Sequence, residues 1–131
     1  MAKDMGVERA LHPVDWLSGS ELHAAYHASD IVLQPSVYFE PFGLIALEAM
    51  ACKKPVIASL FGGLPEIVEN GITGYTVDAR NTEHFADAVV SLLQNTQKAR
   101  EMGIEGYDRA AREFSPDMQI SALLSYYEAK S

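Results

Sequence analysis

The chain has 131 residues, enough for one domain with a buried core, and its 48% apolar and 21% charged residues are ordinary for a soluble globular protein. The net charge of −8 argues against a nucleic-acid partner, because phosphate contacts need clustered Lys and Arg. No apolar run reaches the ~18 residues of a membrane span, the N-terminus has no signal-peptide pattern, and the single cysteine, Cys52, cannot form an internal disulfide. These features predict a cytoplasmic protein in which Cys52 is a buried structural thiol rather than a catalytic one.

The N-terminal part is predicted to contain two helices with an edge strand between them. Residues 1–8 are typical of the end of a polar helix. Residues 9–17 indicate a short strand, and Pro13 restricts it to a sheet edge because proline cannot donate a ladder hydrogen bond. A serine cap followed by apolar residues at helical spacing predicts a helix over 20–28.

Buried strands alternate with helices in the rest of the chain. Ile31-Val32-Leu33 is an unalternating apolar run, typical of a strand covered on both faces. Two further strands are predicted at 55–58 and 74–77. The predicted helices lie at 43–52, between Gly63 and Asn70, and at 82–95, 96–112 and 116–129. The helix at 82–95 is amphipathic, and its apolar face consists of Phe85, Ala88, Val89, Leu92 and Leu93. Strands that alternate with helices form parallel sheets with covered faces, so the predicted fold class is α/β, a Rossmann-like three-layer α/β/α arrangement.

Two carboxylates near the first of these helices are the main candidates for chemistry. Glu40 lies in the preceding loop, and Glu48 follows eight residues later among apolar neighbours. Eight residues of helix rise roughly 12 Å, too far for an acid/base pair on one bond but suited to the two ends of an extended ligand. The alternatives for Glu48 are a solvated helix face or a cap on a neighbouring backbone group.

Glycines stand at two consecutive strand-to-helix junctions. Gly43 begins one helix, and Gly62 and Gly63 precede the next. A glycine at a helix start lets an anion approach the backbone N–H groups closely, although a tight turn is the commoner use. Two such junctions on neighbouring strands would line one crevice at the carboxyl edge of the sheet.

Other candidate residues carry weaker signals. Tyr38, Phe39 and Phe42 could stack on a base or sugar, but packing is the commoner role of such aromatics. His23 and His27 are four residues apart on a helix, yet no third ligand is obvious, so no metal site is predicted. The chain has no Gly-x-Gly-x-x-Gly, no Gly-Lys-Ser/Thr phosphate loop and no Gly-x-Ser-x-Gly elbow, which disfavours the common dinucleotide-binding, nucleotide-hydrolysing and serine-hydrolase functions.

Several ordered motifs resemble the nucleotide-sugar domain of the group 1 glycosyltransferases, the glycosyltransferase family 4 enzymes related to glycogen, starch and sucrose synthases. The resemblance covers about residues 14–95, and the C-terminal helices are compatible with it. The matching stretches are 28–36, 38–44, 48–51, 55–58, 62–68 and 70–77.

This resemblance implies retaining transfer of a sugar from a UDP-, ADP- or GDP-sugar on the two-domain GT-B architecture, without a metal or other cofactor. It implies that Glu40 is the catalytic carboxylate near the donor sugar and that Glu48 holds the ribose hydroxyls. Backbone N–H groups of Phe42, Gly43 and Leu44 would meet the sugar or diphosphate. Tyr38 and the Gly62-Gly63 pair are further donor-binding candidates.

The chain departs from the family pattern in residues and in extent. Asp15 stands where the family usually has glycine after the edge strand, close to the expected base. Lys53 stands where a glycine usually ends the helix, so the left-handed helix cap is expected to be strained or rearranged. The domain's first two strands and the whole acceptor domain precede residue 1 in the family, so residues 1–131 match one partial C-terminal domain. A gap or an exposed sheet edge is the expected result, and such an edge invites strand pairing, swapping or aggregation. The expected protein partner is the N-terminal acceptor domain or, through self-association, a second copy of the chain.

Two other functions remain open at this point. A non-catalytic module of the same ancestry would act through dimerisation or by binding a partner, and its stability would not respond to nucleotide. A generic Rossmann-like cofactor domain is a more distant alternative, because its glycine fingerprint is missing.

Overall fold

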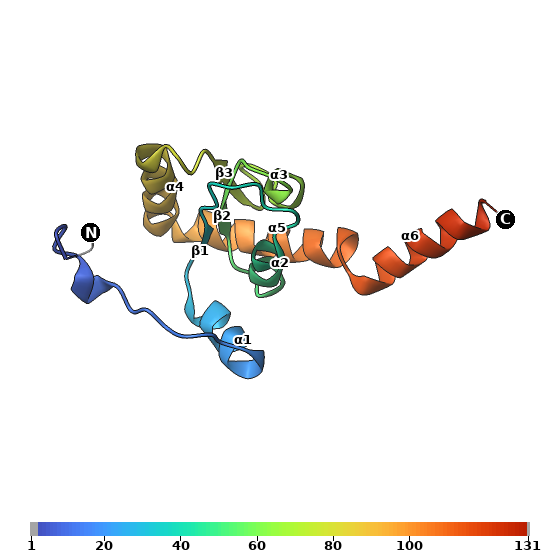
Figure 1. The fold of residues 1–131 in the computed structure, drawn as a ribbon, viewed down its shortest axis with the longest axis horizontal. Helices are drawn as coiled ribbons and strands as arrows, with labels where there is room; N and C mark the ends of the chain where they lie inside the picture. The colour runs from blue at the N-terminus through green and yellow to red at the C-terminus, as the bar shows by residue number, and fades with distance from the viewer. Residues whose placement is uncertain (1–2, 131) are drawn as a thin grey trace.

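A three-stranded parallel sheet organises the chain, whose structure is described over residues 3–130 in a computed structural model (Figure 1). The strands are β1 (Val32–Gln34), β2 (Val56–Ser59) and β3 (Gly74–Val77), and they lie in the order β1-β2-β3. Val56 pairs with Val32 on one side and with Gly74 on the other, so β2 is the central strand.

Helices connect the strands and continue after the last one. They are η1 (Glu8–Ala10, a 3-10 turn), α1 (Gly19–Ala28), α2 (Leu44–Ala51), α3 (Leu64–Ile67), α4 (Thr82–Gln94), α5 (Thr96–Glu113) and α6 (Pro116–Glu128). The predicted α/β class with a parallel sheet is confirmed. From residue 19 onward each element lies within about two residues of its predicted bounds, except that α3 ends three residues before Asn70. Among the described residues, no helix combines the length and apolar character needed to cross a membrane.

Side chains alternate across β2 and build a separate core on each face of the sheet. Val56 and Ala58 face one core, which contains buried residues of α2 and α3. Ile57 faces the other core with Leu92 of α4 and Met102 of α5. Because successive side chains of a strand point to opposite faces, this division makes the three-layer arrangement predicted from the sequence.

Helix α5 reaches both cores and passes very close to the end of α2. Met102 enters the core shared with α4, and Ala110 packs against the α2 core. Between them, Gly103 lies against the backbone of Lys53, so close that a Cβ on Gly103 would overlap the Lys53 carbonyl oxygen. Lys53 itself has φ +57, so of the two outcomes expected for the helix cap, strain or rearrangement, the strained left-handed cap is present, at a backbone cost of about 1–2 kcal/mol. The α2–β2 turn therefore has a strained backbone at Lys53 and is in direct contact with α5.

The predicted strand over 9–17 is wrong. Part of it is η1, residues 11–18 form no regular structure, and all of these residues are exposed except Leu17, which is half-buried. Pro13 removes one donor, and no described strand lies alongside to supply a ladder, so the segment gains nothing from being extended. The predicted helix over 1–8 is also wrong within the described part, where residues 3–6 are turns; residues 1–2 lie outside it.

Two predicted core positions are exposed. Leu33 is 44% exposed although its apolar run predicts a strand covered on both faces, and Leu93 is 53% exposed although its spacing predicts a place on the apolar face of α4. β1 is an edge of the sheet and no described helix covers Leu33, whereas Leu92 takes the buried position that Leu93 was expected to share.

The last helix is capped as predicted but packs against little. The Ser115 side chain accepts a hydrogen bond from the Met118 N–H, and Pro116 is the first helical residue. Figure 1 shows α6 extending away from the sheet, and no residue of α6 is buried. Its exposed apolar side chains are Met118, Ile120, Leu123, Leu124, Tyr126 and Tyr127.

Gly103→Ala tests the close passage of α5 over the α2–β2 turn. Alanine normally stabilises a helix interior by about 1 kcal/mol relative to glycine. Here we expect the free energy of unfolding to fall by about 1–3 kcal/mol, because the new methyl group must displace backbone. Urea denaturation followed by circular dichroism measures this change.

Gly106→Ala is the matched control on the same helix. Its Cβ would lie 3.1 Å from Cγ of Met50, so a side-chain atom has to move by only a few tenths of an ångström, and the effect is expected to stay within about 1 kcal/mol of the wild type. Equal stability of the two variants would contradict the packing described for Gly103.

Candidate functional site

The loop after β1 is held against the loop after β2 by backbone contacts. The N–H of Gly63 donates a 2.8 Å hydrogen bond to the carbonyl oxygen of Glu40. Gly62 has φ +73, and a Cβ there would overlap the backbone of Glu40. A Cβ on Gly63 would come within 2.8 Å of the Pro41 carbonyl oxygen. The two glycines are therefore required for the approach of one loop to the other, and the N–H of Gly63 is already engaged.

Gly43 joins the same junction to the start of α2. It is buried, has φ +95 and precedes the first helical residue. A Cβ at this position would lie 2.5 Å from Cδ2 of Leu64, the first residue of α3. The starts of α2 and α3 therefore meet at the carboxyl edge of the sheet, where the sequence placed both junctions. The first N–H groups of a helix have no intrahelical acceptor, so this edge favours an anion.

Glu48 lies one turn into α2 with an exposed carboxylate that is held from one side. The hydroxyl of Tyr26, on α1, donates a 2.8 Å hydrogen bond to Oε2 of Glu48. Burial raises the pKa of the Tyr26 hydroxyl, and its bond to Glu48 raises it further, so Tyr26 keeps its proton and remains a donor. Glu48 is neither a cap nor an unpartnered acid; one carboxylate oxygen is oriented by tyrosine.

The prediction that Glu40 and Glu48 are separated by roughly 12 Å of helix is wrong, because Glu40 lies outside the helix. That value assumed helix over all eight residues, but α2 begins at Leu44. Only the four steps from Leu44 to Glu48 are helical, a rise of roughly 6 Å. The chain between Glu40 and Leu44 turns through Gly43 instead of continuing the helix axis.

The three aromatic residues of the loop separate into two environments. Tyr38 and Phe39 are 66% and 79% exposed, and Phe42 is 47% exposed. Phe42 contacts Phe114 edge to face with ring centroids 6.4 Å apart. Packing explains Phe42, whereas it does not explain Tyr38 and Phe39, which remain available to a flat ligand.

Arg109 supports the second loop and was not singled out by the sequence. Its guanidinium donates to the carbonyl oxygens of Ile67 at 3.1 Å and Glu66 at 3.0 Å, at the end of α3. It also forms ion pairs with Glu69 and Glu113, each at 3.2 Å. These contacts fix the helix that follows Gly63. The two bonds to backbone carbonyls span 42 and 43 positions of sequence, and no local spacing predicts them.

On the α1 side of Glu48, the structure supplies a third potential metal ligand that the sequence did not reveal. Cys52, directly after α2, is 9% exposed and lies near His23 and His27. Burial raises the pKa of the Cys52 thiol, Glu48 adds to the increase and Lys54 opposes it. Asp15, which was expected close to the base, lies in the exposed irregular segment.

Gly62→Ala and Gly71→Ala together test the contact between the loops. Both glycines have positive φ, +73 and +82, so alanine strains the backbone about equally, by about 1–2 kcal/mol. A Cβ on Gly71 would have open space within 4 Å, whereas a Cβ on Gly62 would meet Glu40. We expect Gly62→Ala to lose about 1–3 kcal/mol more of unfolding free energy and to make the 35–43 loop easier to cleave with protease. If the two variants behave alike, the loops are not held together as described.

Comparisons of the sequence with a family model and with known proteins point to the same family. The family model described as "Glycosyl transferases group 1" matches residues 1–109. A D-inositol 3-phosphate glycosyltransferase of Corynebacterium glutamicum is 42% identical over 127 residues, which cover 97% of this chain and 30% of that protein. The chain thus spans about a third of the length of the curated relatives it matches.

Solved structures agree with the sequence comparison. A sucrose-phosphate synthase from Thermosynechococcus elongatus superposes with a TM-score of 0.88 at 32% identity, covering 99% of this chain and 33% of that one. Anabaena HepE, solved in complex with UDP-glucose, superposes with a TM-score of 0.86 at 27% identity, covering 95% of this chain and 35% of that one. By its sequence and its fold, the chain belongs to the group 1 glycosyltransferases.

Proposed function

We propose that this chain is the donor-binding part of a retaining glycosyltransferase that uses a nucleoside-diphosphate sugar. The observation that carries the proposal is the junction of two loops and two helix starts at one sheet edge, with Glu40 at the junction and Glu48 one turn along α2. Support comes from the similarity to HepE, whose structure contains UDP-glucose.

The start of α2 is proposed to receive the negatively charged part of the donor. Phe42, Gly43 and Leu44 lie where the chain turns into the helix, and the backbone N–H groups and helix dipole there favour an anion. Gly62 and Gly63 are proposed to serve the donor through the Glu40 loop. The Gly63 N–H is bonded to the carbonyl oxygen of Glu40, so the glycine pair holds that loop in place.

Glu48 is proposed to accept hydrogen bonds from the ribose hydroxyls. A carboxylate has two oxygens, and Tyr26 occupies a site on only one of them, which leaves acceptor capacity for a neighbouring diol. Tyr26 is a positioning residue in this scheme: it limits the rotation of the Glu48 carboxylate before the donor arrives. Pre-orientation of this kind reduces the entropy lost on binding.

Glu40 is proposed to act at the donor sugar as the catalytic carboxylate, with Tyr38 beside the donor. Glu40 is half-buried, and its backbone is fixed by Gly63, so the side chain projects from a rigid base. A carboxylate placed at the sugar would accept hydroxyl protons and stabilise positive charge that develops at the anomeric carbon. No metal or other cofactor is assigned a part in this transfer.

The acceptor is proposed to bind elsewhere, on a domain joined to this one in a longer or assembled protein. The chain covers 30% of the C. glutamicum relative, and β1 leaves one sheet edge open within the described residues. Residues that precede this segment in such a protein would extend the sheet from β1 and provide the acceptor site.

Glu48→Gln tests the donor site. A thermal-shift panel of UDP, ADP, GDP and their glucose conjugates should identify one nucleotide that stabilises the wild-type chain. For that nucleotide, calorimetric titration should show Glu48→Gln at least tenfold weaker, which corresponds to about 1.4 kcal/mol, because a charged acceptor is lost. Glu21→Gln, an exposed substitution on α1, is the control and should bind normally.

The same panel distinguishes the alternative functions. Absence of stabilisation by every nucleotide, or unchanged affinity of Glu48→Gln, would overturn the proposed donor site. A dimer that forms with increasing concentration and is indifferent to nucleotide would instead favour a non-catalytic module.

A further inference from the structure

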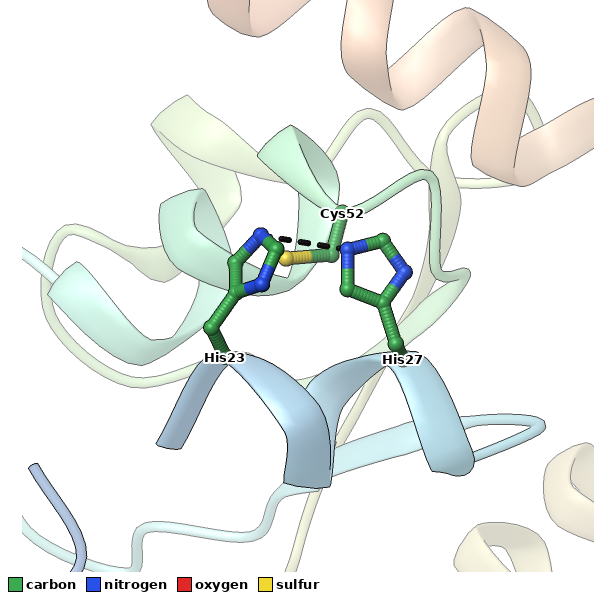
Figure 2. Close-up of side chains that lie close together, drawn as sticks. All are labelled: His23, His27 and Cys52. Atoms are coloured by element: carbon green, nitrogen blue, oxygen red, sulfur yellow. Dashed lines mark hydrogen bonds between the residues drawn. The ribbon is translucent and has the colours of Figure 1, made fainter. Parts of the chain in front are cut away.

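Three side chains with strong metal affinity converge from two separate elements. His23 and His27 lie four residues apart on α1 and therefore on one face of the helix, and Cys52 follows α2 directly. Figure 2 shows both imidazoles projecting from α1 toward the Cys52 sulfur. Their potential ligand atoms all lie within 4.8 Å of one another.

The spacing of these atoms is close to what a tetrahedral ion needs. Nε2 of His23 and Nε2 of His27 are 3.1 Å apart. Zinc–nitrogen bonds of about 2.0–2.1 Å at a tetrahedral angle place two nitrogens roughly 3.3 Å apart, and a zinc–sulfur bond of about 2.3 Å gives a nitrogen–sulfur spacing of roughly 3.6 Å. The histidine pair is nearly at the required distance, and the spacings to the Cys52 sulfur, which are at most 4.8 Å, must shorten by up to roughly 1 Å.

The element that carries the histidines has room to make this adjustment. α1 has no buried residue, and both imidazoles are exposed. Side-chain hydrogen bonds connect α1 to the α2 segment at two places: from Tyr26 to Glu48, and from Lys54 Nζ to the carbonyl oxygen of His27, each 2.8 Å long. Small rotations of the two histidines can therefore close the cluster without repacking a core.

The chemistry of the donors selects the type of ion. Thiolate and imidazole are ligands of zinc and similar transition metals, whereas magnesium and calcium require oxygen ligands. The two imidazoles share a hydrogen bond and an edge-to-face ring contact with centroids 4.3 Å apart. An ion would replace that hydrogen bond with two coordinate bonds to the same nitrogens.

We propose that His23, His27 and Cys52 form a binding site for Zn²⁺ or a similar transition-metal ion, with three protein ligands and a fourth position open to water. The bound ion would fasten α1 to the end of α2, beside the Tyr26–Glu48 contact. Metal binding at this site needs no nucleotide, so it can be tested independently of the proposed donor site.

Co²⁺ is the spectroscopic probe that tests the site in the reduced, metal-free 131-residue chain. Titration should give one tight ion per chain, the intense visible bands of a tetrahedral site and a near-ultraviolet thiolate charge-transfer band, and Zn²⁺ should abolish all of them. Cys52→Ser should lose the charge-transfer band. His23→Gln and His27→Gln should each bind Zn²⁺ at least ~10-fold more weakly. Removal of a direct ligand should weaken binding at least as much as an outer-shell change, which costs about 10–100-fold in metal affinity.

His12→Gln provides the matched control, because His12 is an exposed histidine in the irregular segment outside the cluster. It should keep wild-type affinity and spectrum. His23 and His27 are on the surface, so their variants should retain the circular dichroism of the wild type and report binding rather than unfolding. Weak octahedral cobalt spectra without a thiolate band, or equal Zn²⁺ affinity of His23→Gln and His12→Gln, would overturn the proposal.

Discussion

The backbone contact between Glu40 and the Gly62-Gly63 pair determines how the candidate site is built. One hydrogen bond and two glycines bring the loop after β1 onto the loop after β2. Parallel strands place such loops at the same edge, but only the absence of side chains at 62 and 63 lets their backbones meet. Gly43 extends the contact to the start of α2. The backbone of Glu40 is consequently held at both junctions at once, which is a more rigid support for its side chain than a single loop provides.

Local sequence patterns predicted the elements well and the contacts between them poorly. Apolar runs and caps located the three strands and most helices, because those signals arise from residues close together in the chain. The prediction of a strand over 9–17 was wrong because a strand needs a partner strand, which a local pattern does not reveal. The predicted burial of Leu33 and Leu93 was wrong for a related reason. Burial depends on which elements cover a position, and the apolar character of a residue does not supply them.

The candidate site shows the same division. Glu40, Glu48 and the glycines were proposed as candidates from their spacing, but the hydrogen bond from Tyr26 to Glu48 joins residues 22 positions apart. Arg109 supports α3 across 42 positions. Cys52 adds a third potential metal ligand to His23 and His27, because α1 and the end of α2 meet only in the folded chain. Each missed feature depends on tertiary contact between side chains whose separate sequence contexts are ordinary.

The absence of any buried residue in α1 has a consequence for the population of binding-competent molecules. Segments with little buried surface detach at low free-energy cost while the rest of the domain remains folded. Tyr26 leaves with α1, so Glu48 loses its orientation in that fraction of the molecules. The measured affinity of a ligand equals its intrinsic affinity multiplied by the competent fraction. Whatever secures α1 would therefore strengthen the binding proposed for Glu48 without contacting the ligand.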